Sequence, residues 1–414
     1  MSNFSYQNQT LHAESVAITE LVATYDSPLY IYSKAEIETN WYTFNDAFGD
    51  HPHLVCFAVK ANSNLAVLNV LAKIGSGFDV VSRGELERVL AAGGKADRCV
   101  FSGVAKTIDE IERALEVGIR CFNVESSSEL DRIEQVASRL NVQAPVSIRV
   151  NPDVDAKTHP YISTGLKENK FGVDIDDAVN LYQKANDSEH LNVQGLDCHI
   201  GSQITDVSPF LDALDKVLAL VSQLQSKGIE IAHLDLGGGI GIKYDDEQTI
   251  DIATYVSSVL DKVGDLEIIL EPGRAIVGNA GVFVTKVEFL KQNSEHSFAI
   301  IDGAMNDLLR PAFYNAYHQV LPVNENTKGI DASWDLVGPI CETGDFLAKN
   351  RKLSLSEGDF LAFMSAGAYG FTMSSNYNSR PRVAEVMVSN NTHTLVRERE
   401  TIQDLFNKEY IIND

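Results

Sequence analysis

The chain has 414 residues, 44% of them hydrophobic and 22% charged, which is the composition of a globular protein too long for one ordinary core. Its formal net charge of −24 argues against nucleic-acid or anionic-membrane partners, because phosphate binding needs clustered basic side chains. The five cysteines are far apart and form no CxxC pair, which favours a reducing cytoplasm and argues against a zinc site. Since the chain also shows neither a signal-peptide pattern nor an apolar run of membrane length, we expect a cytoplasmic protein.

Short apolar runs alternate with amphipathic stretches through the first two thirds of the chain. Eight such runs end in polar or glycine residues: 54–60, 77–82, 98–102, 120–125, 145–151, 195–201, 233–239 and 267–273. Strands that alternate with helices predict a parallel sheet. Eight of these units favour a closed (β/α)8 barrel of the TIM type, with an open doubly wound sheet as the alternative.

Three of the predicted helices begin with the pattern of a capping box, a hydroxyl residue followed three positions later by a glutamate. The pairs are Ser82 with Glu85, Thr107 with Glu110, and Ser126 with Glu129. Gly118 provides a helix stop, since glycine readily adopts the left-handed conformation found there. These signals support helices between the predicted strands.

The pattern changes after about residue 280, where strands follow one another with few helices between them. The predicted strands are 282–289, 297–301, 334–337, 359–364 and 382–388, and residues 28–32 could add another. We therefore expect an α/β barrel over 36–280 and a second, mostly β domain formed by 1–35 together with 281–414.

Lys60 is the first candidate for chemistry, because it closes the apolar run that begins at residue 54. Burial disfavours the ammonium form of a lysine, and a neutral amine can condense with an aldehyde to form a Schiff base. The ordinary alternative is a strand-end lysine that reaches into solvent.

The active site of a (β/α)8 barrel forms at the carboxyl ends of its strands. The residues expected there are Lys60, Asp79, Ser82, Ser102, Glu125, Arg149, Asn151, His199, Gly237, Gly238, Gly239, Glu271 and Arg274. The glycine run can present backbone N–H groups to a phosphate, or it can simply be a tight turn. Glu271 can hold a proton on a ring nitrogen or pair with a cation, and His199 can stack on an aromatic cofactor or pack in the core.

Two motifs of the second domain also suggest chemistry. Cys341 precedes Glu342 in a glycine-rich turn, where a thiol beside a carboxylate suits a proton donor; the alternative is an inert buried cysteine. Tyr369 is flanked in the sequence by small residues. This pattern suits either a phosphate contact or a β-turn.

Together these motifs resemble the fold-type III pyridoxal-phosphate-dependent decarboxylases, most closely the members that act on diaminopimelate. The resemblance is carried in order by residues 57–62 (FAVKAN), 77–80 (GFDV), 199–202 (HIGS), 237–239 (GGG), 271–274 (EPGR), 305–314 (MNDLLRPAFY) and 341–345 (CETGD). Thr343 departs from the family pattern, where serine is more usual, and this puts no chemistry in doubt.

The resemblance implies a role for each motif of the barrel. Lys60 would hold pyridoxal 5'-phosphate as a Schiff base, Glu271 would keep its ring nitrogen protonated, and His199 would stack on the ring with Asp79 nearby. The phosphate and cofactor contacts would come from Ser202, Gly237, Gly238, Gly239, Gly273, Arg274 and Tyr369.

The resemblance further implies decarboxylation of meso-2,6-diaminopimelate to L-lysine and CO2, the last step of lysine biosynthesis. Substrate contacts would come from Arg274, Arg310, Tyr314 and Tyr369 together with Glu342, which would bind the distal ammonium, and Cys341 would reprotonate the α-carbon. Ornithine has no distal carboxylate and would leave two arginines without a partner, which penalises its binding. Decarboxylation of ornithine, arginine or carboxynorspermidine is the close alternative; a non-catalytic relative and an alanine-racemase-like enzyme are the others.

In this family the cysteine and the acidic residue of the CETGD motif come from the partner subunit. The resemblance therefore implies a homodimer with shared active sites, in which the β-rich domain contributes substrate and dimer contacts. Residues 167–172 would belong to a loop that covers the site.

Overall fold

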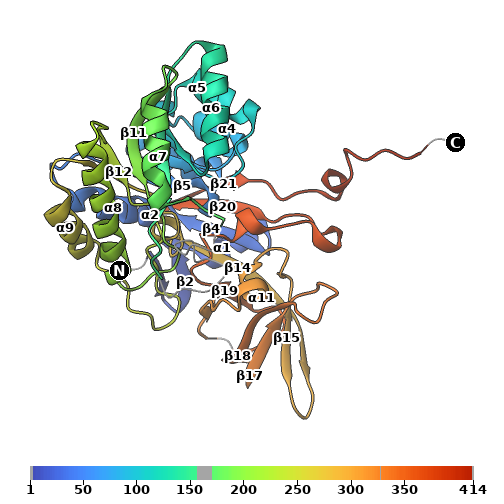
Figure 1. Ribbon diagram of the computed structural model, residues 1–414. Coiled ribbons are helices and arrows are strands. Elements are labelled where there is room, and N and C mark those ends of the chain that lie inside the picture. Colours follow the sequence, from blue (N-terminus) through green and yellow to red (C-terminus); the bar gives the residue numbers. More distant parts are fainter. Residues whose placement is uncertain (1–2, 156–169, 327, 413–414) are drawn as a thin grey trace. The chain divides into compact units, whose positions relative to one another are not determined.

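The computed structural model describes residues 3–155, 170–326 and 328–412 (Figure 1). The chain divides into two compact units. One, the barrel unit, comprises residues 38–242 and 247–276, and the other, the β-rich unit, comprises residues 1–37, 243–246 and 277–414.

The barrel unit contains eight parallel strands closed into a ring. In ring order they are β5 (His53–Ala58), β6 (Gly77–Val80), β7 (Cys99–Phe101), β8 (Cys121–Val124), β9 (Ala144–Asn151), β11 (Leu191–Asp197), β12 (His233–Asp235) and β13 (Glu267–Leu270). Pairing of β13 with β5 and of β8 with β9 completes the ring, and the short β10 (Val173–Asp174) adds to β9. The predicted closed barrel is confirmed, and the open sheet is excluded.

Helices follow the barrel strands, as the amphipathic stretches predict. They are α3 (Leu65–Lys73), α4 (Arg83–Ala91), α5 (Ile108–Val117), α6 (Ser127–Leu140), α7 (Ile175–Asn186), α8 (Ser208–Ser226), α9 (Ile252–Val263) and the short α10 (Arg274–Val277), and one more helix, α2 (Lys34–Ala47), precedes β5. Because helices cover the outside of such a ring, its strands are buried on both faces and read as apolar runs.

Only one of the three predicted capping boxes forms completely, the one between Thr107 and Glu110 at the start of α5. Ser82 and Ser126 do cap α4 and α6. The carboxylate of Glu85, however, accepts from the backbone N–H of Val81, one residue before the cap. Glu129 likewise accepts from the backbone of Glu125 and from the buried Lys106 ammonium at 2.7 Å. Ser126 and Glu129 therefore give a cap but no reciprocal box.

The β-rich unit is built on a large, mostly antiparallel sheet. Its elements are β1 (Phe4–Gln7), β2 (Thr10–Ala13), β3 (Val16–Ala17), α1 (Ile18–Tyr25), β4 (Leu29–Ser33), β14 (Gly281–Gln292), β15 (Ser297–Ile301), α11 (Arg310–Tyr314), β16 (Val320–Pro322), β17 (Ile330–Val337), β18 (Phe346–Leu355), β19 (Phe360–Phe363), β20 (Ala384–Ser389) and β21 (Thr392–Arg397). The five strands predicted after residue 280 are all present, whereas β16, β18 and β21 were not predicted.

The N-terminal strand β4 lies inside this sheet, antiparallel to β14 and parallel to β20. All of its residues are buried. Successive side chains of a strand point to opposite faces of the sheet, so both faces are covered at β4. Leu29 and Ile31 pack into an apolar cluster on one face. The hydroxyls of Tyr30 and Tyr32 donate to the Asp307 carbonyl and the Glu385 carboxylate, each at 2.7 Å. The prediction that residues 28–32 join the second domain's sheet is confirmed.

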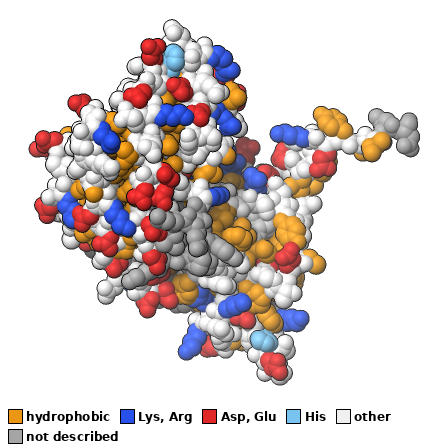
Figure 2. Space-filling view, viewed as in Figure 1, with side chains coloured by type: hydrophobic (Ala, Val, Ile, Leu, Met, Phe, Trp, Pro, Cys, Tyr) orange, Lys and Arg blue, Asp and Glu red, His pale blue; other side chains and the backbone are white. Residues whose placement is uncertain are grey.

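The C-terminal segment leaves the sheet after β21 and passes through a short 3-10 turn, Ile402–Leu405. It carries hydrophobic side chains along its length (Figure 2), and Tyr410, Ile411 and Ile412 are 94%, 87% and 93% exposed. Among the described residues, no helix combines the length and apolar character needed to cross a membrane.

Candidate active site

Lys60 lies at the carboxyl end of the barrel, in a 3-10 turn (Val59–Ala61) that directly follows β5. Its ammonium nitrogen is 2.6 Å from Oδ2 of Asp79, which is fully buried on the adjacent strand β6. The register pairs Ala58 with Asp79, so the two neighbouring strand ends bring these side chains together. The Lys60 side chain remains 39% exposed. It is therefore an amine held at the mouth of the barrel, not a lysine that simply extends into solvent.

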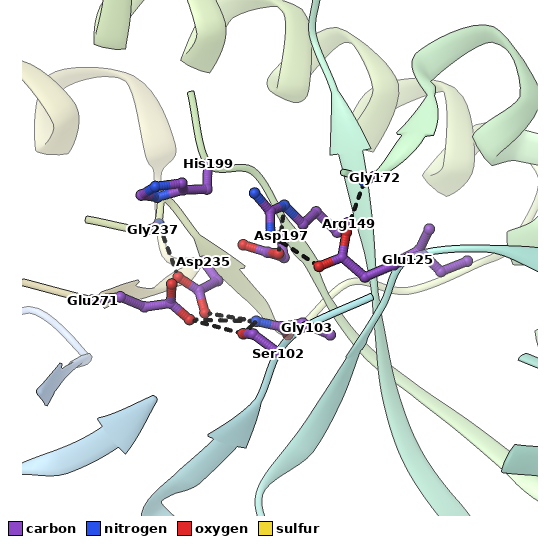
Figure 3. Close-up of polar contacts among 12 residues, drawn as sticks. Ser102, Gly103, Glu125, Arg149, Gly172, Asp197, His199, Asp235, Gly237 and Glu271 are labelled. Carbon is purple, nitrogen blue, oxygen red and sulfur yellow. Dashed lines mark hydrogen bonds and ion pairs between the residues drawn. The ribbon is translucent and has the colours of Figure 1, made fainter. Parts of the chain in front are cut away.

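Three buried carboxylates gather beside this pair, each at the end of a barrel strand. Oxygen atoms of Asp197, Asp235 and Glu271 lie within 4.8 Å of one another. Asn123 donates to Asp235 Oδ2 at 3.3 Å and to Glu271 Oε1 at 3.4 Å. Ser102 donates to the same Glu271 oxygen, and Figure 3 shows the Glu271 side chain directed toward Ser102. The cluster holds Glu271 in a fixed orientation.

Burial and mutual repulsion set the protonation of this cluster. Burial, followed by the charges of Asp235 and Asp79, raises the pKa of Glu271 well above its ordinary value. Burial also raises the pKa of Asp235 to about 6, although the Gly237 N–H, which donates to it at 2.9 Å, opposes the shift. The carboxylates are therefore not all ionised near neutral pH. Such a site favours a proton or an organic cation placed against Glu271.

Arg149 supplies positive charge on the other side of the cluster. Its Nη1 is 2.9 Å from Glu125 Oε1 and its Nε is 3.8 Å from Asp197 Oδ2, and both pairs are buried. The second Glu125 oxygen accepts from the backbone N–H of Gly172 at 2.7 Å. These bonds connect β8, β9 and β11 with the chain just beyond residue 170 (Figure 3). Residues 167–169 of the predicted covering loop lie outside the described residues.

His199, two residues beyond β11, presents a neutral imidazole. Its Nδ1 accepts from the backbone N–H of Gly238 at 3.1 Å, so the ring proton belongs on Nε2. Burial, then the charges of Arg149 and Lys60, lowers the pKa of His199 well below its ordinary value. A neutral, flat ring fixed by a backbone bond is suited to stacking.

The glycine run after β12 leaves no room for side chains. Gly237 and Gly239 have φ of +66° and +102°, which other residues rarely adopt. A Cβ on Gly238 would lie 2.2 Å from the Glu271 carbonyl oxygen, and one on Gly239 would lie 2.3 Å from the Gly201 carbonyl oxygen. The backbone here is therefore bare and closely packed against two neighbouring strand ends.

Ser202 and Arg274 meet beside this run, where Arg274 Nη2 donates to Ser202 Oγ at 3.1 Å. Gly273 precedes Arg274, and a Cβ there would lie 3.0 Å from the Cβ atoms of Ala58 and Ala61. A hydroxyl, a guanidinium and bare backbone together form a site suited to a phosphate.

Replacing Gly238 with alanine is expected to destabilise the barrel by about 1–3 kcal/mol, because the added Cβ overlaps a backbone oxygen that must move. Thermal unfolding of the purified variant measures this. Gly84→Ala is the matched control, since its nearest atom would be Ser82 Oγ at 3.7 Å, and it should unfold within about 0.5 kcal/mol of the parent. Equal melting temperatures for the two variants would contradict the packing argument.

The β-rich unit carries the remaining predicted residues. Arg310 begins α11 and is buried, with Nη1 3.0 Å from His318 Nε2 and its guanidinium 4.6 Å from the centre of the Tyr244 ring. Tyr314 ends the same helix, and Tyr369 lies after β19 with φ of 55°.

Cys341 and Glu342 lie in the turn between β17 and β18. Of the five cysteines Cys341 alone is exposed, so the alternative of an inert buried thiol is wrong for it. Asn378 accepts from the Cys341 backbone N–H at 2.8 Å, and the Tyr377 hydroxyl donates to Glu342.

Three polar residues of the carboxylate cluster escaped the sequence analysis as site residues: Asn123, Asp197 and Asp235. Each carried a signal, because each is a polar residue near the carboxyl end of a barrel strand. In a fully buried strand such a residue needs a partner, and in a barrel the partners come from neighbouring strand ends.

Comparison with known proteins identifies relatives over the whole chain. Residues 34–278 match the family described as pyridoxal-dependent decarboxylase, pyridoxal binding domain. Diaminopimelate decarboxylase of Pseudomonas aeruginosa is 57% identical over 414 residues, and that of Vibrio cholerae is 56% identical over 416, with 100% of both chains covered in each comparison. The crystal structure of diaminopimelate decarboxylase from Helicobacter pylori complexed with L-lysine superposes with a TM-score of 0.92 at 43% identity, covering 95% of this chain and 99% of that one.

The barrel site fits the cofactor of that family. The buried excess of carboxylates around Glu271 suits a protonated pyridine nitrogen, and the bare backbone at Gly239 and Gly273, beside Ser202 and Arg274, suits a phosphate. Lys60 offers the amine and His199 a flat, neutral ring. Pyridoxal phosphate is the cofactor, and the chain belongs to the pyridoxal-dependent decarboxylases.

Proposed function

We propose that the protein decarboxylates meso-2,6-diaminopimelate to L-lysine and CO2, the last step of lysine biosynthesis. The observation that carries the chemistry is the Lys60–Asp79 pair at the mouth of a barrel whose interior holds the buried Glu271 cluster. The substrate follows from relatives named diaminopimelate decarboxylase, which match the full length of the chain at 56–57% identity. L-lysine in the structure of a similar protein agrees with the expected product.

Each barrel residue has a distinct task in this proposal. Bound pyridoxal phosphate supplies an electron sink for the charge left when CO2 departs. Lys60 holds the cofactor aldehyde through its amine, which Asp79 orients. Glu271 holds a proton at the ring nitrogen, and His199 packs against the ring face. The phosphate contacts are Ser202, Gly239, Gly273 and Tyr369, and Gly237, Gly238 and Arg274 complete the cofactor site.

The β-rich unit provides the groups that distinguish the substrate. Arg310 and Tyr314 share α11, and with Arg274 they bind the distal carboxylate. Contacts with His318 and Tyr244 already fix the Arg310 guanidinium in one plane, which favours bidentate carboxylate binding. Glu342 binds the distal ammonium, and the Cys341 thiol holds the proton that is delivered to the α-carbon.

The protein works as a cytoplasmic homodimer in this proposal, with Cys341 and Glu342 supplied to the partner subunit's site. The exposure of both residues on the separate chain supports this arrangement. The barrel over 36–280 binds the cofactor, and residues 1–35 with 281–414 contribute substrate and dimer contacts.

A substrate panel tests the proposal. We expect kcat/KM for CO2 release from meso-diaminopimelate to exceed that from ornithine by about 10³-fold or more, because ornithine leaves buried carboxylate-binding groups unpaired. Arg310→Lys should lower kcat/KM for diaminopimelate by about 10²-fold, since lysine loses the planar fork. Arg139→Lys, on the exposed face of α6, is the matched control. Faster turnover of ornithine would overturn the proposed substrate.

A further inference from the structure

Tyr377 makes the one side-chain hydrogen bond to Glu342 among the described residues. Its hydroxyl donates to Glu342 Oε1, across 35 residues of sequence. Both side chains are exposed, Tyr377 by 44%. A free glutamate at such a position would sample many rotamers, so the phenol restricts the side chain to one orientation and occupies one of its two oxygens.

The turn that carries Glu342 is anchored on both flanks. On one side the Asn378 side chain accepts from the Cys341 backbone N–H at 2.8 Å. On the other, buried Asp345 accepts from the backbone N–H groups of Ile340 at 2.8 Å and Met305 at 2.7 Å. The backbone is therefore fixed, and the direction of the Glu342 side chain depends on Tyr377.

The segment that presents Tyr377 is itself held firmly. Arg380 donates to the Asp302 carbonyl at 2.6 Å and to Asn306 Oδ1 at 3.2 Å. Asn376 donates to the Arg380 carbonyl at 3.0 Å and to Glu400 at 2.6 Å. Asn378 adopts φ of 56°, a conformation that asparagine tolerates better than most residues. These hydrogen bonds therefore fix the position of the segment that carries the Tyr377 hydroxyl.

We propose that Tyr377 is a positioning residue that orients Glu342, so that Glu342 Oε2 meets the distal ammonium of the substrate. The inference rests on the proposed function, in which Glu342 recognises that ammonium. Part of the substrate preference then comes from the Tyr377 phenol, which acts through the Glu342 carboxylate and not on the reacting atoms. The effect should consequently appear in substrate binding more than in turnover.

Tyr377→Phe removes the hydroxyl and keeps the ring. We expect KM for meso-diaminopimelate to rise about 5- to 10-fold, as for loss of one hydrogen bond to a charged group, with kcat changed less than about twofold. Tyr42→Phe is the matched control, because Tyr42 is also a partly exposed tyrosine, at 42%. It should leave both constants unchanged.

A double-variant cycle separates positioning from a general structural effect. Glu342→Gln alone should raise KM, and adding Tyr377→Phe to it should change KM by less than about twofold, because the two residues act as one unit. An unchanged KM in Tyr377→Phe would overturn the inference. So would an equal effect of Tyr377→Phe in the parent and Glu342→Gln backgrounds.

A readout without substrate keeps this inference distinct from the proposed function. The hydrogen bond to Glu342, then burial and then the Glu342 charge raise the pKa of Tyr377 above the ordinary tyrosine value. Titration by NMR of ring-labelled tyrosine, with Tyr377→Phe identifying the resonance, should show that Glu342→Gln lowers this pKa. If the pKa falls but the parent does not decarboxylate diaminopimelate, the proposed substrate fails and the Tyr377–Glu342 contact stands. An unchanged pKa would contradict the contact itself.

Discussion

Replacing Lys60 with alanine is expected to lower kcat for CO2 release by about 10³-fold or more and to leave the barrel folded. In the proposed function this amine holds the cofactor and later releases the product, so no other group replaces it. The side chain is 39% exposed and follows β5, so its loss leaves no cavity within the ring. Decarboxylation assays and thermal unfolding measure the two effects.

Borohydride reduction and peptide mapping provide an independent check on Lys60. In the parent enzyme the reduced cofactor should remain attached to the peptide that contains Lys60, and in Lys60→Ala no such adduct should form. Lys73→Ala, at the exposed end of α3, should retain both turnover and the adduct. An adduct on another lysine of the parent would show that the cofactor amine is misassigned.

Glu271→Gln is expected to lower kcat by about 10²- to 10³-fold, because an amide cannot hold a proton on the ring nitrogen as a carboxylate does. The fold should tolerate the change, since the amide oxygen can still accept from Asn123 and Ser102. Steady-state kinetics with diaminopimelate measure the loss. Glu267→Gln, at the opposite end of β13, is the matched control and should retain turnover.

The same substitution has a predictable effect on stability. The pKa of Glu271 is raised in the folded protein, so the folded state binds protons more tightly than the unfolded state and loses stability as pH rises through the shifted pKa. Glutamine does not ionise, so the variant does not lose stability in this way. The cofactor-free variant should therefore melt at an equal or higher temperature than the parent at pH 8. Lower stability would mean that Glu271 is paired with a cation in the folded protein.

The barrel was predictable because its signal is local. Parallel strands covered on both faces read as short apolar runs, and eight of them matched eight strands. The Lys60–Asp79 pair could also be anticipated, since the two residues end consecutive strands. By contrast β18 was missed because lysine and arginine residues occupy its exposed face, and a half-exposed strand of that composition resembles a loop.

Contacts between distant segments could not be predicted from the sequence. Nothing local connects Tyr377 with Glu342, and only the folded β-rich unit brings the two together. The glutamates of the incomplete capping boxes give the same lesson. Glu129 fits the motif in sequence, but the buried ammonium of Lys106 competes for its carboxylate. The other carboxylate oxygen accepts from the backbone N–H of Glu125 in place of Ser126, so the box stays open.

The place of β4 in the β-rich sheet governs the order in which the protein can be completed during translation. β4 is synthesised before the barrel, yet its neighbours β14 and β20 emerge only after it. The barrel strands can therefore close while both edges of Leu29–Ser33 are still unpaired. In the finished sheet this strand is buried along its whole length. A nascent chain that stops before β14 would carry a closed barrel and an N-terminal strand with two unpaired edges, and is expected to depend on chaperones for solubility.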